Sequence, residues 1–278
     1  MKFSKSIFAL TASFSFLIWP NLNDMIIHST NQFNGNMGYN NSSMVTNGEY
    51  NVIKKLIKPH DVIFDIGANR GEWSSAVLSI VSNIDKIYAF EPIPVIFNVL
   101  SEKMLNKPIK AYELALSDVN GMRDFLLYSQ NEQVSELSSF YSRPILYNLL
   151  GIKPKIITVK SATLDKFCCE KNIKHIDFLK IDTEGSELAV LKGAQAFLKN
   201  KAIQHIQFEY GGTYTDAGTT LKQVMSLLTS CEYVIFRIFS KGLIHIASWD
   251  DSLENYAYSN YVAVLKENAY QFSLIDNL

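Results

Sequence analysis

The sequence predicts an α/β fold in which helices cover both faces of a mostly parallel sheet. Short apolar segments alternate with segments of helical character from residue 61 to residue 210, and such alternation is typical of a doubly wound sheet. The first strand, 62–66 (VIFDI), is apolar except for Asp65, as expected for a strand covered on both faces. Of the 278 residues, 47% are hydrophobic, so the chain can bury a sizeable core.

Residues 1–20 form an apolar N-terminal segment. Lys2 and Lys5 precede the apolar stretch 6–19, and Pro20 ends it. The stretch is too short to span a bilayer comfortably but has the length of a signal-peptide core. No small-x-small cleavage site follows it. A signal sequence, a shallow membrane anchor and an apolar helix packed on the domain remain alternatives.

The rest of the chain divides into a linker and one domain. Residues 21–46 are rich in asparagine and have no sustained periodicity, so we expect a linker there. We expect residues 47–278 to form the domain. Its first helix has apolar residues at helical spacing from Tyr50 to Ile57, and Pro59 ends it.

The elements of the domain follow in order from local patterns. We expect strands at 62–66, 87–90, 110–116, 176–181 and 203–208, and helices at 73–82, 94–106, 164–171, 187–198 and 221–228. Pro94 suits a first helical turn, and Thr219 or Thr220 caps the last helix. A hairpin-like pair, 123–128 and 156–159, encloses an irregular insertion, and the C-terminal segments 233–239, 243–247 and 261–265 read as antiparallel strands.

Charge and cysteine content exclude several classes of protein. The 26 Lys and Arg residues balance 27 Asp and Glu residues, and this lack of basic excess argues against a nucleic-acid partner. The 3 cysteines show no C-x-x-C spacing, which excludes a disulfide framework and a structural zinc site. We expect buried or half-buried thiols in a reducing compartment, and therefore a cytoplasmic protein. Membrane association through residues 6–19, or secretion, stays open.

A candidate ligand loop follows the first strand. Gly67 and Gly71 allow a tight turn and leave room for a ligand close to the backbone. Asn69 tolerates a left-handed conformation, and Asp65 places a carboxylate at the strand end. The loop is not G-x-G-x-x-G, and its acid suits a positively charged ligand better than a pyrophosphate. A tight turn without a ligand is the alternative.

The next two strand ends carry further polar residues. Glu91 lies 20 residues after Gly71, where a carboxylate in dinucleotide-binding folds accepts hydrogen bonds from a ribose diol. Ser117 and Asp118 follow the third strand and could reach an adenine amino group, although a surface turn explains them almost as well.

The fourth and fifth strands end in acids. Asp182 and Glu184 follow the fourth strand, and Glu209 ends the fifth. Ligands of such sheets bind beyond the carboxyl ends of the strands, so these three acids are candidate catalytic residues. Helix capping is the alternative explanation, since acids are favoured in a first helical turn.

Five motifs, taken together, resemble the FkbM family of methyltransferases. They are DIGANRG at 65–71, FEP at 90–92, ALSD at 115–118, TLD at 163–165 and KIDTEGSE at 180–187. The resemblance covers residues 61–210 and extends weakly to 266. It also matches Ser138 and Ser139 to a serine pair that the family often has. The N-terminal 46 residues lie outside it.

The resemblance implies a Rossmann-like class I methyltransferase fold with seven strands in the order 3-2-1-4-5-7-6. It implies S-adenosylmethionine as cofactor and O-methylation of a sugar, glycan or small natural product. The methionine part of the cofactor would lie among Asp65, Gly67, Asn69 and Gly71. Its ribose would contact Glu91, and its adenine would contact Ser117 and Asp118.

The resemblance also suggests the base for methyl transfer. Asp182 or Glu184 would take the hydroxyl proton, with Glu209 in reserve, and we expect no metal ion. The alternatives are an NAD(P)-dependent oxidoreductase and a non-catalytic, membrane-tethered binding module. The sequence does not indicate an oligomeric state.

Overall fold

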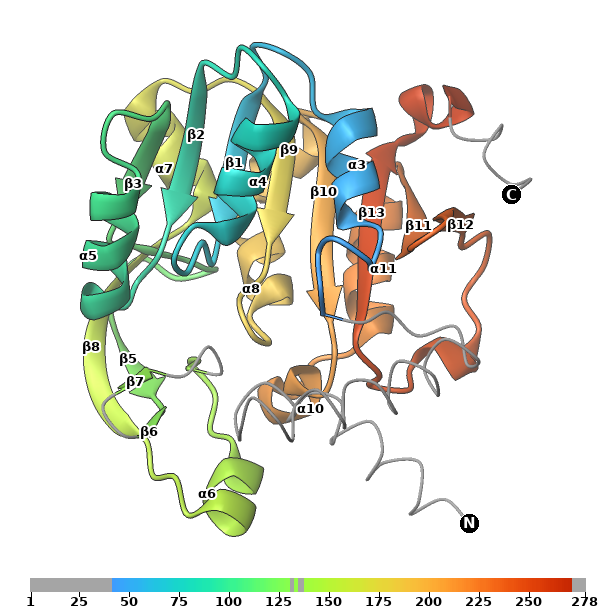
Figure 1. Cartoon of the computed structure of the whole chain (residues 1–278). Coiled ribbons are helices and arrows are strands. Elements are labelled where there is room, and N and C mark those ends of the chain that lie inside the picture. The colour runs from blue at the N-terminus through green and yellow to red at the C-terminus, as the bar shows by residue number, and fades with distance from the viewer. Residues whose placement is uncertain (1–41, 131–132, 135–137, 272–278) are drawn as a thin grey trace.

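A single large sheet forms the centre of the computed structural model, which describes residues 42–130, 133–134 and 138–271 (Figure 1). The sheet has eight strands in the order β12-β11-β13-β10-β9-β1-β2-β3. These are β1 (Val62–Ile66), β2 (Lys86–Phe90), β3 (Ile109–Tyr112), β9 (Ile176–Ile181), β10 (Ile203–Tyr210), β11 (Tyr233–Phe239), β12 (Gly242–His245) and β13 (Ser259–Leu265).

Seven strands of the sheet follow the predicted order, but the sheet has eight strands and not the predicted seven. From β3 to β11 the order is the expected 3-2-1-4-5-7-6. The eighth strand, β12, extends the edge by pairing antiparallel with β11. β13 runs antiparallel to both of its neighbours, β10 and β11, and the remaining pairs are parallel.

Helices cover both faces of the sheet because its strands alternate apolar side chains between two buried layers. Ile63 packs in the layer of α3 and α4, whereas Phe64 packs in the layer of α7, α8 and α11. One face carries α3 (Glu49–Leu56), α4 (Glu72–Ile80) and α5 (Pro94–Lys103), and the other carries α7 (Leu164–Lys171), α8 (Glu187–Lys192), α9 (Gln195–Lys199) and α11 (Leu221–Ser230).

A small second sheet lies beside the first, with the order β4-β8-β5. It consists of β4 (Ala115–Leu116), β5 (Gly121–Leu127) and β8 (Lys155–Ala162). The predicted hairpin-like pair is confirmed, since β5 and β8 pair antiparallel. The predicted strand 110–116 is wrong: β3 ends at Tyr112, and β4 pairs with β8 instead of β2.

The insertion between β5 and β8 is more ordered than we expected. Its described part contains β6 (Ser129–Gln130), β7 (Gln133–Val134) and the helix α6 (Pro144–Leu150). β6 and β7 pair antiparallel. The predicted irregular insertion is therefore corrected to a short hairpin followed by a helix.

The predicted helix 187–198 is broken into α8 and α9 at Gly193. A Cβ at Gly193 would lie 2.0 Å from the Ser117 carbonyl oxygen, so the second sheet packs directly against the break. Asp165 stabilises the new helix start by accepting hydrogen bonds from two backbone N–H groups of α9 at 2.8 and 3.2 Å. The expected cap of α11 is confirmed as Thr220, within a capping box.

Three short helices complete the described chain: α10 (Thr213–Ala217), η1 (Asp251–Leu253) and η2 (Lys266–Gln271). Cys168 is buried and Cys231 half-buried, but Cys169 is exposed, contrary to expectation. Within the described ranges no helix is long and apolar enough to cross a membrane. Residues 1–41, with the apolar segment 6–19, lie outside those ranges, as do residues 135–137.

Candidate active site

The loop after β1 has the left-handed backbone that its sequence predicts. Its φ angles are +78° at Gly67, +47° at Asn69 and +76° at Gly71. A Cβ at Gly67 would lie 1.8 Å from the Asp182 carbonyl oxygen, and one at Gly71 would lie 2.1 Å from the Met104 side chain. A backbone contact within the chain therefore requires glycine at position 67, whereas at Gly71 the neighbour is a flexible side-chain end and the positive φ favours glycine, whether or not a ligand also approaches.

The ends of β1 and β9 are joined by this close approach. The Asp182 N–H donates a hydrogen bond to the Ile66 carbonyl at 2.9 Å. The candidate ligand loop and the first candidate catalytic acid thus share one piece of backbone structure.

Glu91 ties the same loop to β2. Its two carboxylate oxygens accept hydrogen bonds from the backbone N–H groups of Asn69 at 3.0 Å and Ile93 at 2.9 Å. The side chain is 5% exposed. Burial raises the pKa of Glu91 to about 7, against the lowering effect of the two backbone donors. Glu91 therefore shapes the loop, in addition to any contact with a ribose.

Asp65 is fully buried beside Lys180. Ser74 Oγ donates to Asp65 Oδ2 at 2.7 Å, whereas Oδ1 accepts no hydrogen bond from the described residues and lies 3.8 Å from Lys180 Nζ. Lys180 Nζ also contacts Asp182 at 2.8 Å. Burial lowers the pKa of Lys180, but Asp182, Asp65 and Glu49 together raise it above its usual value.

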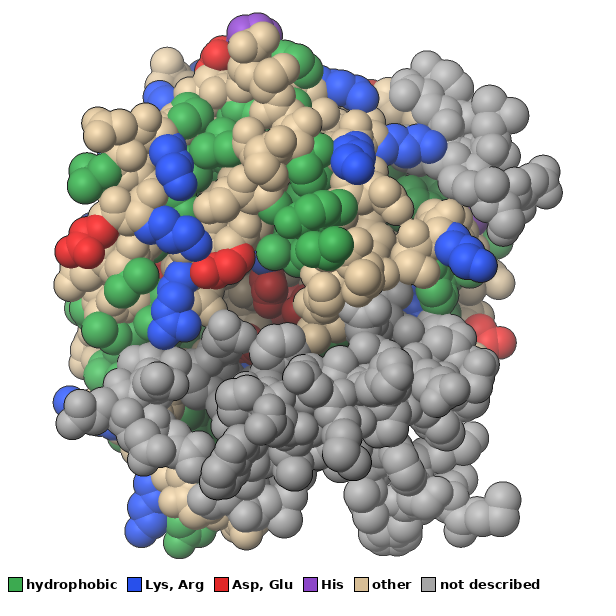
Figure 2. All heavy atoms as spheres, in the orientation of Figure 1, with side chains coloured by type: hydrophobic (Ala, Val, Ile, Leu, Met, Phe, Trp, Pro, Cys, Tyr) green, Lys and Arg blue, Asp and Glu red, His purple; other side chains and the backbone are tan. Residues whose placement is uncertain are grey.

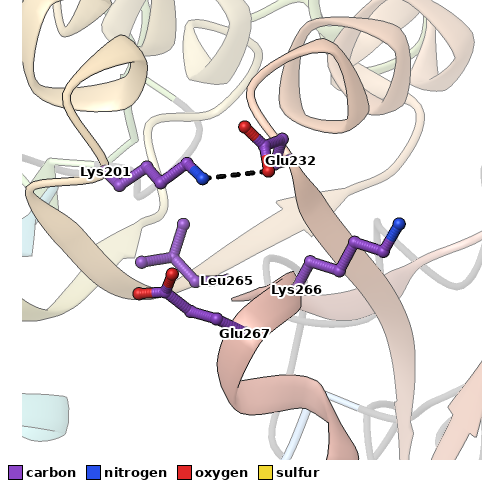
Figure 3. Close-up of a pocket in the computed structure, with 5 residues that line it drawn as sticks. All are labelled: Lys201, Glu232, Leu265, Lys266 and Glu267. Atoms are coloured by element: carbon purple, nitrogen blue, oxygen red, sulfur yellow. Dashed lines mark ion pairs between the residues drawn. The ribbon is translucent and has the colours of Figure 1, made fainter.

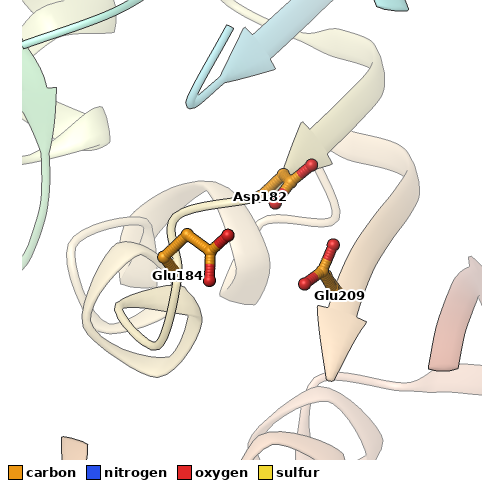
Figure 4. Close-up of side chains that lie close together, drawn as sticks. All are labelled: Asp182, Glu184 and Glu209. Atoms are coloured by element: carbon orange, nitrogen blue, oxygen red, sulfur yellow. The ribbon is translucent and has the colours of Figure 1, made fainter. Parts of the chain in front are cut away.

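The three candidate catalytic acids form one cluster. Asp182 directly follows β9, Glu184 lies on the turn after it and Glu209 lies on β10, and their carboxylates face a common space (Figure 4). One oxygen of each lies within 4.8 Å of the others. Figure 2 shows acidic side chains recessed in the middle of one face of the molecule. The expectation that these three acids meet beyond the strand ends is therefore confirmed, and their catalytic role stays a prediction.

Cations compensate two of the three acids. Lys180 contacts Asp182 at 2.8 Å, and Arg143 Nη2 contacts Glu184 Oε2 at 3.0 Å. Within the described ranges, no cation lies at ion-pair distance from Glu209. Burial raises the pKa of Glu209 well above its usual value, and the Asp182 and Glu184 carboxylates raise it further.

Glu187 holds the turn that carries Glu184. Its carboxylate accepts hydrogen bonds from the Thr183 N–H at 2.8 Å, the Thr183 hydroxyl at 2.9 Å and the Gly185 N–H at 3.0 Å. Burial raises the pKa of Glu187 to about 7. Helix capping therefore explains Glu187, whereas Asp182 and Glu184 belong to the acid cluster.

Ser117 and Asp118 lie in a different set of contacts. Ser117 is fully buried and its hydroxyl accepts a hydrogen bond from Arg123 Nη1 at 2.7 Å, while Asp118 is exposed and lies 3.9 Å from the same Arg123 atom. Among the described contacts, Ser117 packs against the break between α8 and α9, and none joins it to Asp182, Glu184 or Glu209. Its expected contact with adenine stays a prediction.

Sequence reasoning missed a buried network behind the acids. Glu49, the first residue of α3, is 4% exposed and accepts hydrogen bonds from Asn47 Nδ2 at 2.6 Å and Gln207 Nε2 at 2.7 Å. Lys180 lies opposite Asp65 on one side and Gln207 on the other in the register of the sheet. The buried carboxylate of Glu49 therefore lies on the side of Lys180, the same buried ammonium group that Asp65 and Asp182 contact.

A surface pocket lies away from these residues (Figure 3). It is lined by Lys201, Glu232, Leu265, Lys266 and Glu267. These residues lie at the starts of β10 and β11 and at the end of antiparallel β13. The pocket is therefore at the amino ends of the parallel strands, whereas the acids are at their carboxyl ends. Lys201 and Glu232 already form an ion pair at 2.9 Å, so the pocket adds nothing to the candidate site.

The comparison with known families decides the assignment. The family model of the methyltransferase FkbM domain matches residues 65–235, more than half of the chain. The chain belongs to the FkbM methyltransferase family. The predicted resemblance is confirmed, and its fold is the expected Rossmann-like class I methyltransferase fold with one additional edge strand.

Three curated relatives of this FkbM-family protein agree with the assignment. It is 28% identical over 192 residues to the 2-O-methyltransferase NoeI of Sinorhizobium fredii, covering 66% of this chain and 77% of that protein. It is 27% identical over 190 residues to the hexuronic acid methyltransferase AglP of Haloferax volcanii, covering 66% and 70%. It is 26% identical over 167 residues to the 31-O-demethyl-FK506 methyltransferase FkbM of Streptomyces tacrolimicus, covering 50% and 61%.

The enzyme class follows from these findings. The FkbM-family assignment confirms the predicted methyltransferase. It also counts against both alternatives, the NAD(P)-dependent oxidoreductase and the non-catalytic module.

Proposed function

We propose that this FkbM-family enzyme transfers a methyl group from S-adenosylmethionine to a hydroxyl group of a sugar, a glycan or a small natural product. The observation that carries the proposal is the acid cluster of Asp182, Glu184 and Glu209, adjacent to the β1 loop. The names of three relatives, a 2-O-methyltransferase, a hexuronic acid methyltransferase and an O-demethyl-FK506 methyltransferase, support a hydroxyl acceptor.

The residues at the β1 loop fit a positively charged cofactor. Asp65 Oδ1 is buried without a hydrogen bond from the described residues, and the neighbouring acids outnumber the single ammonium group of Lys180. Such an excess of negative charge favours a sulfonium over a neutral or anionic ligand. When bound, S-adenosylmethionine supplies an activated methyl group.

Each part of the cofactor has candidate contacts in this chain. Asp65, Gly67, Asn69 and Gly71 would surround its methionine part. Glu91 would hold its ribose, because each carboxylate oxygen can accept a second hydrogen bond beside the backbone one. Asp118, with Ser117 behind it, would lie at the adenine edge.

We assign the role of general base to Glu209. Asp182 and Glu184 are each held by a cation, whereas no cation of the described chain lies at ion-pair distance from Glu209. Burial and the Asp182 and Glu184 carboxylates raise the pKa of Glu209, so its ionised form is a stronger base than an ordinary carboxylate, and general-base catalysis contributes about 10²–10⁴-fold. Asp182 and Glu184 would orient the acceptor hydroxyl, and alignment alone can supply about 7–11 kcal/mol of the barrier.

We further propose that the transfer needs no metal ion. The spacing of the three carboxylates would suit a hard divalent cation. However, Lys180 and Arg143 already compensate two of the three negative charges. This compensation weakens the attraction of the cluster for a metal ion.

The test is mass spectrometry of glycan, lipid and small-molecule extracts treated with the protein and an isotope-labelled methyl donor. We expect one labelled methyl group on a defined hydroxyl compound. Glu209→Gln should abolish the product, while Glu113→Gln, at an exposed site on the end of β3, should not. Labelling of a nitrogen or carbon acceptor, or full activity of Glu209→Gln, would contradict the proposal.

A binding titration separates the cofactor from its rival. We expect the purified protein to bind S-adenosylmethionine and not NAD(H). Tight binding of NAD(H) alone would overturn the cofactor assignment.

A further inference from the structure

The insertion between β5 and β8 touches the acid cluster at Glu184. Ser139 Oγ donates a hydrogen bond to the Glu184 carbonyl oxygen at 2.9 Å. Arg143 Nη2 donates to the same carbonyl at 3.1 Å and to Glu184 Oε2 at 3.0 Å. Two side chains of the insertion therefore hold both the backbone and the carboxylate of one candidate catalytic residue.

Both donors are built into the structure. Arg143 is 4% exposed, and its backbone N–H donates to the hydroxyl of Tyr128, itself 1% exposed, at 2.7 Å. Ser139 is fully buried and forms a β-bridge with Leu126 of β5. The contacts to Glu184 thus start from fixed positions next to the second sheet.

Glu184 is a residue that needs such support. Its φ angle is +56°, a left-handed conformation that residues other than glycine rarely adopt. The following residue, Gly185, is packed so closely that a Cβ would lie 2.8 Å from the Thr213 carbonyl oxygen of α10. The turn is therefore closely packed against α10, and Arg143 of the insertion holds the Glu184 carboxylate.

Arg143 is also the cation that serves a second nearby acid. Burial raises the pKa of Asp216 on α10, and Arg143 opposes that effect. Arg143 therefore lies where three segments meet: the insertion, the turn after β9 and the helix after β10. The turn after β9 carries Glu184, and α10 follows the strand that carries Glu209.

We propose that Arg143 is a positioning residue that fixes Glu184 within the acid cluster and couples the insertion to the site of methyl transfer. The proposal rests on the proposed function, in which the cluster is the reaction site. Its consequence is that any acceptor that shifts the insertion also shifts Glu184. The variable insertion then affects the alignment of the hydroxyl as well as contacts to the acceptor.

The first test needs no acceptor. We would measure amide hydrogen exchange of the 183–186 turn in the full chain, with and without S-adenosylhomocysteine. Arg143→Met should speed exchange of this turn at least tenfold, with a smaller increase in Arg143→Lys, which keeps the charge but not the two-point contact. Lys160→Met, at an exposed position of β8, is the matched control and should not change it. Unchanged exchange in Arg143→Met would overturn the proposal.

The second test uses a double-mutant cycle once an acceptor is known. Arg143→Met should lower kcat at least tenfold, while the Kd for S-adenosylhomocysteine changes less than twofold. The same substitution should have little further effect in a Glu184→Gln background, because Arg143 acts through Glu184. Equal losses in both backgrounds, or parallel losses of cofactor affinity and melting temperature, would show a merely structural role. If no methyl transfer is found at all, the proposed function fails while the exchange experiment still decides the positioning role.

Discussion

Replacing Glu91 with alanine should change how the stability of the fold depends on pH. Burial raises the pKa of Glu91 from 4.5 to about 7, so between these values the folded protein holds a proton that the unfolded chain has lost. Because the folded state binds the extra proton, this contribution to stability is fully present below about pH 4.5. It is lost as the pH rises through about 7.

The magnitude follows from the same shift. A tenfold change in a proton dissociation constant corresponds to about 1.4 kcal/mol. A rise from 4.5 to about 7 therefore makes Glu91 responsible for about 3 kcal/mol of stability lost between acid and slightly alkaline pH. Alanine also removes both hydrogen bonds to the backbone N–H groups of Asn69 and Ile93. The variant should be less stable at pH 5, and its deficit should shrink toward pH 8.

Urea unfolding at pH 5 and pH 8 measures this effect. The difference in unfolding free energy between wild type and Glu91→Ala should narrow by about 2.5 kcal/mol from pH 5 to pH 8, because part of the full effect is already lost at pH 5. Glu113→Ala, at an exposed acid, should track wild type at both values. A deficit that is the same at both pH values would refute a raised pKa at Glu91. In calorimetry the same variant should bind S-adenosylhomocysteine about 1–3 kcal/mol more weakly, and an unchanged Kd would remove Glu91 from the cofactor site.

Three further changes test other parts of the structure. Deletion of residues 1–46 should leave the melting temperature nearly unchanged, because the Asn-rich tract has little apolar surface to dock; a drop of many degrees would show that the N-terminal segment packs on the core. Gly67→Ala should destabilise the fold by about 2 kcal/mol or more in urea unfolding, since its Cβ would lie 1.8 Å from the Asp182 carbonyl oxygen; wild-type stability would show that the loop rearranges freely. Once an acceptor is known, excess EDTA should leave the rate unchanged, whereas abolition by EDTA and rescue by magnesium would make the acid cluster a metal site first.

Local sequence pattern was enough to predict the bounds of several strands and one helix. The predicted bounds of β1 (Val62–Ile66), α7 (Leu164–Lys171), β9 (Ile176–Ile181) and β11 (Tyr233–Phe239) agree with the structure to the residue. Each has an apolar pattern that ends at polar, glycine or turn residues. The error at 187–198 has a different origin, because the helix breaks where the Ser117 carbonyl, just after β4, packs against Gly193.

The acids of the candidate site could be predicted, whereas their cationic and amide partners could not. Strand ends are visible in the sequence, and the topology brings the ends of neighbouring strands together. Lys180 stands inside a strand, where its charge is compensated by Asp182 and by Asp65, which the register places beside it. Arg143 reaches the site from the insertion, whose sequence has no periodicity, and Glu49 reaches it from α3, which precedes the sheet. Such contacts depend on tertiary packing, which a local pattern does not encode.

The position of β13 has a consequence for the order in which the protein is made. β13 is the last strand of the described chain, yet it lies between β10 and β11, and all its residues are buried. While the ribosome is still adding residues 240–258, β10 has no partner on one side and β11 has no link to the main sheet. An unpaired strand edge of this kind invites contact with other chains. The sheet of the nascent protein can close only after Leu265 has emerged, so the facing edges of β10 and β11 stay open to aggregation until β13 has been synthesised.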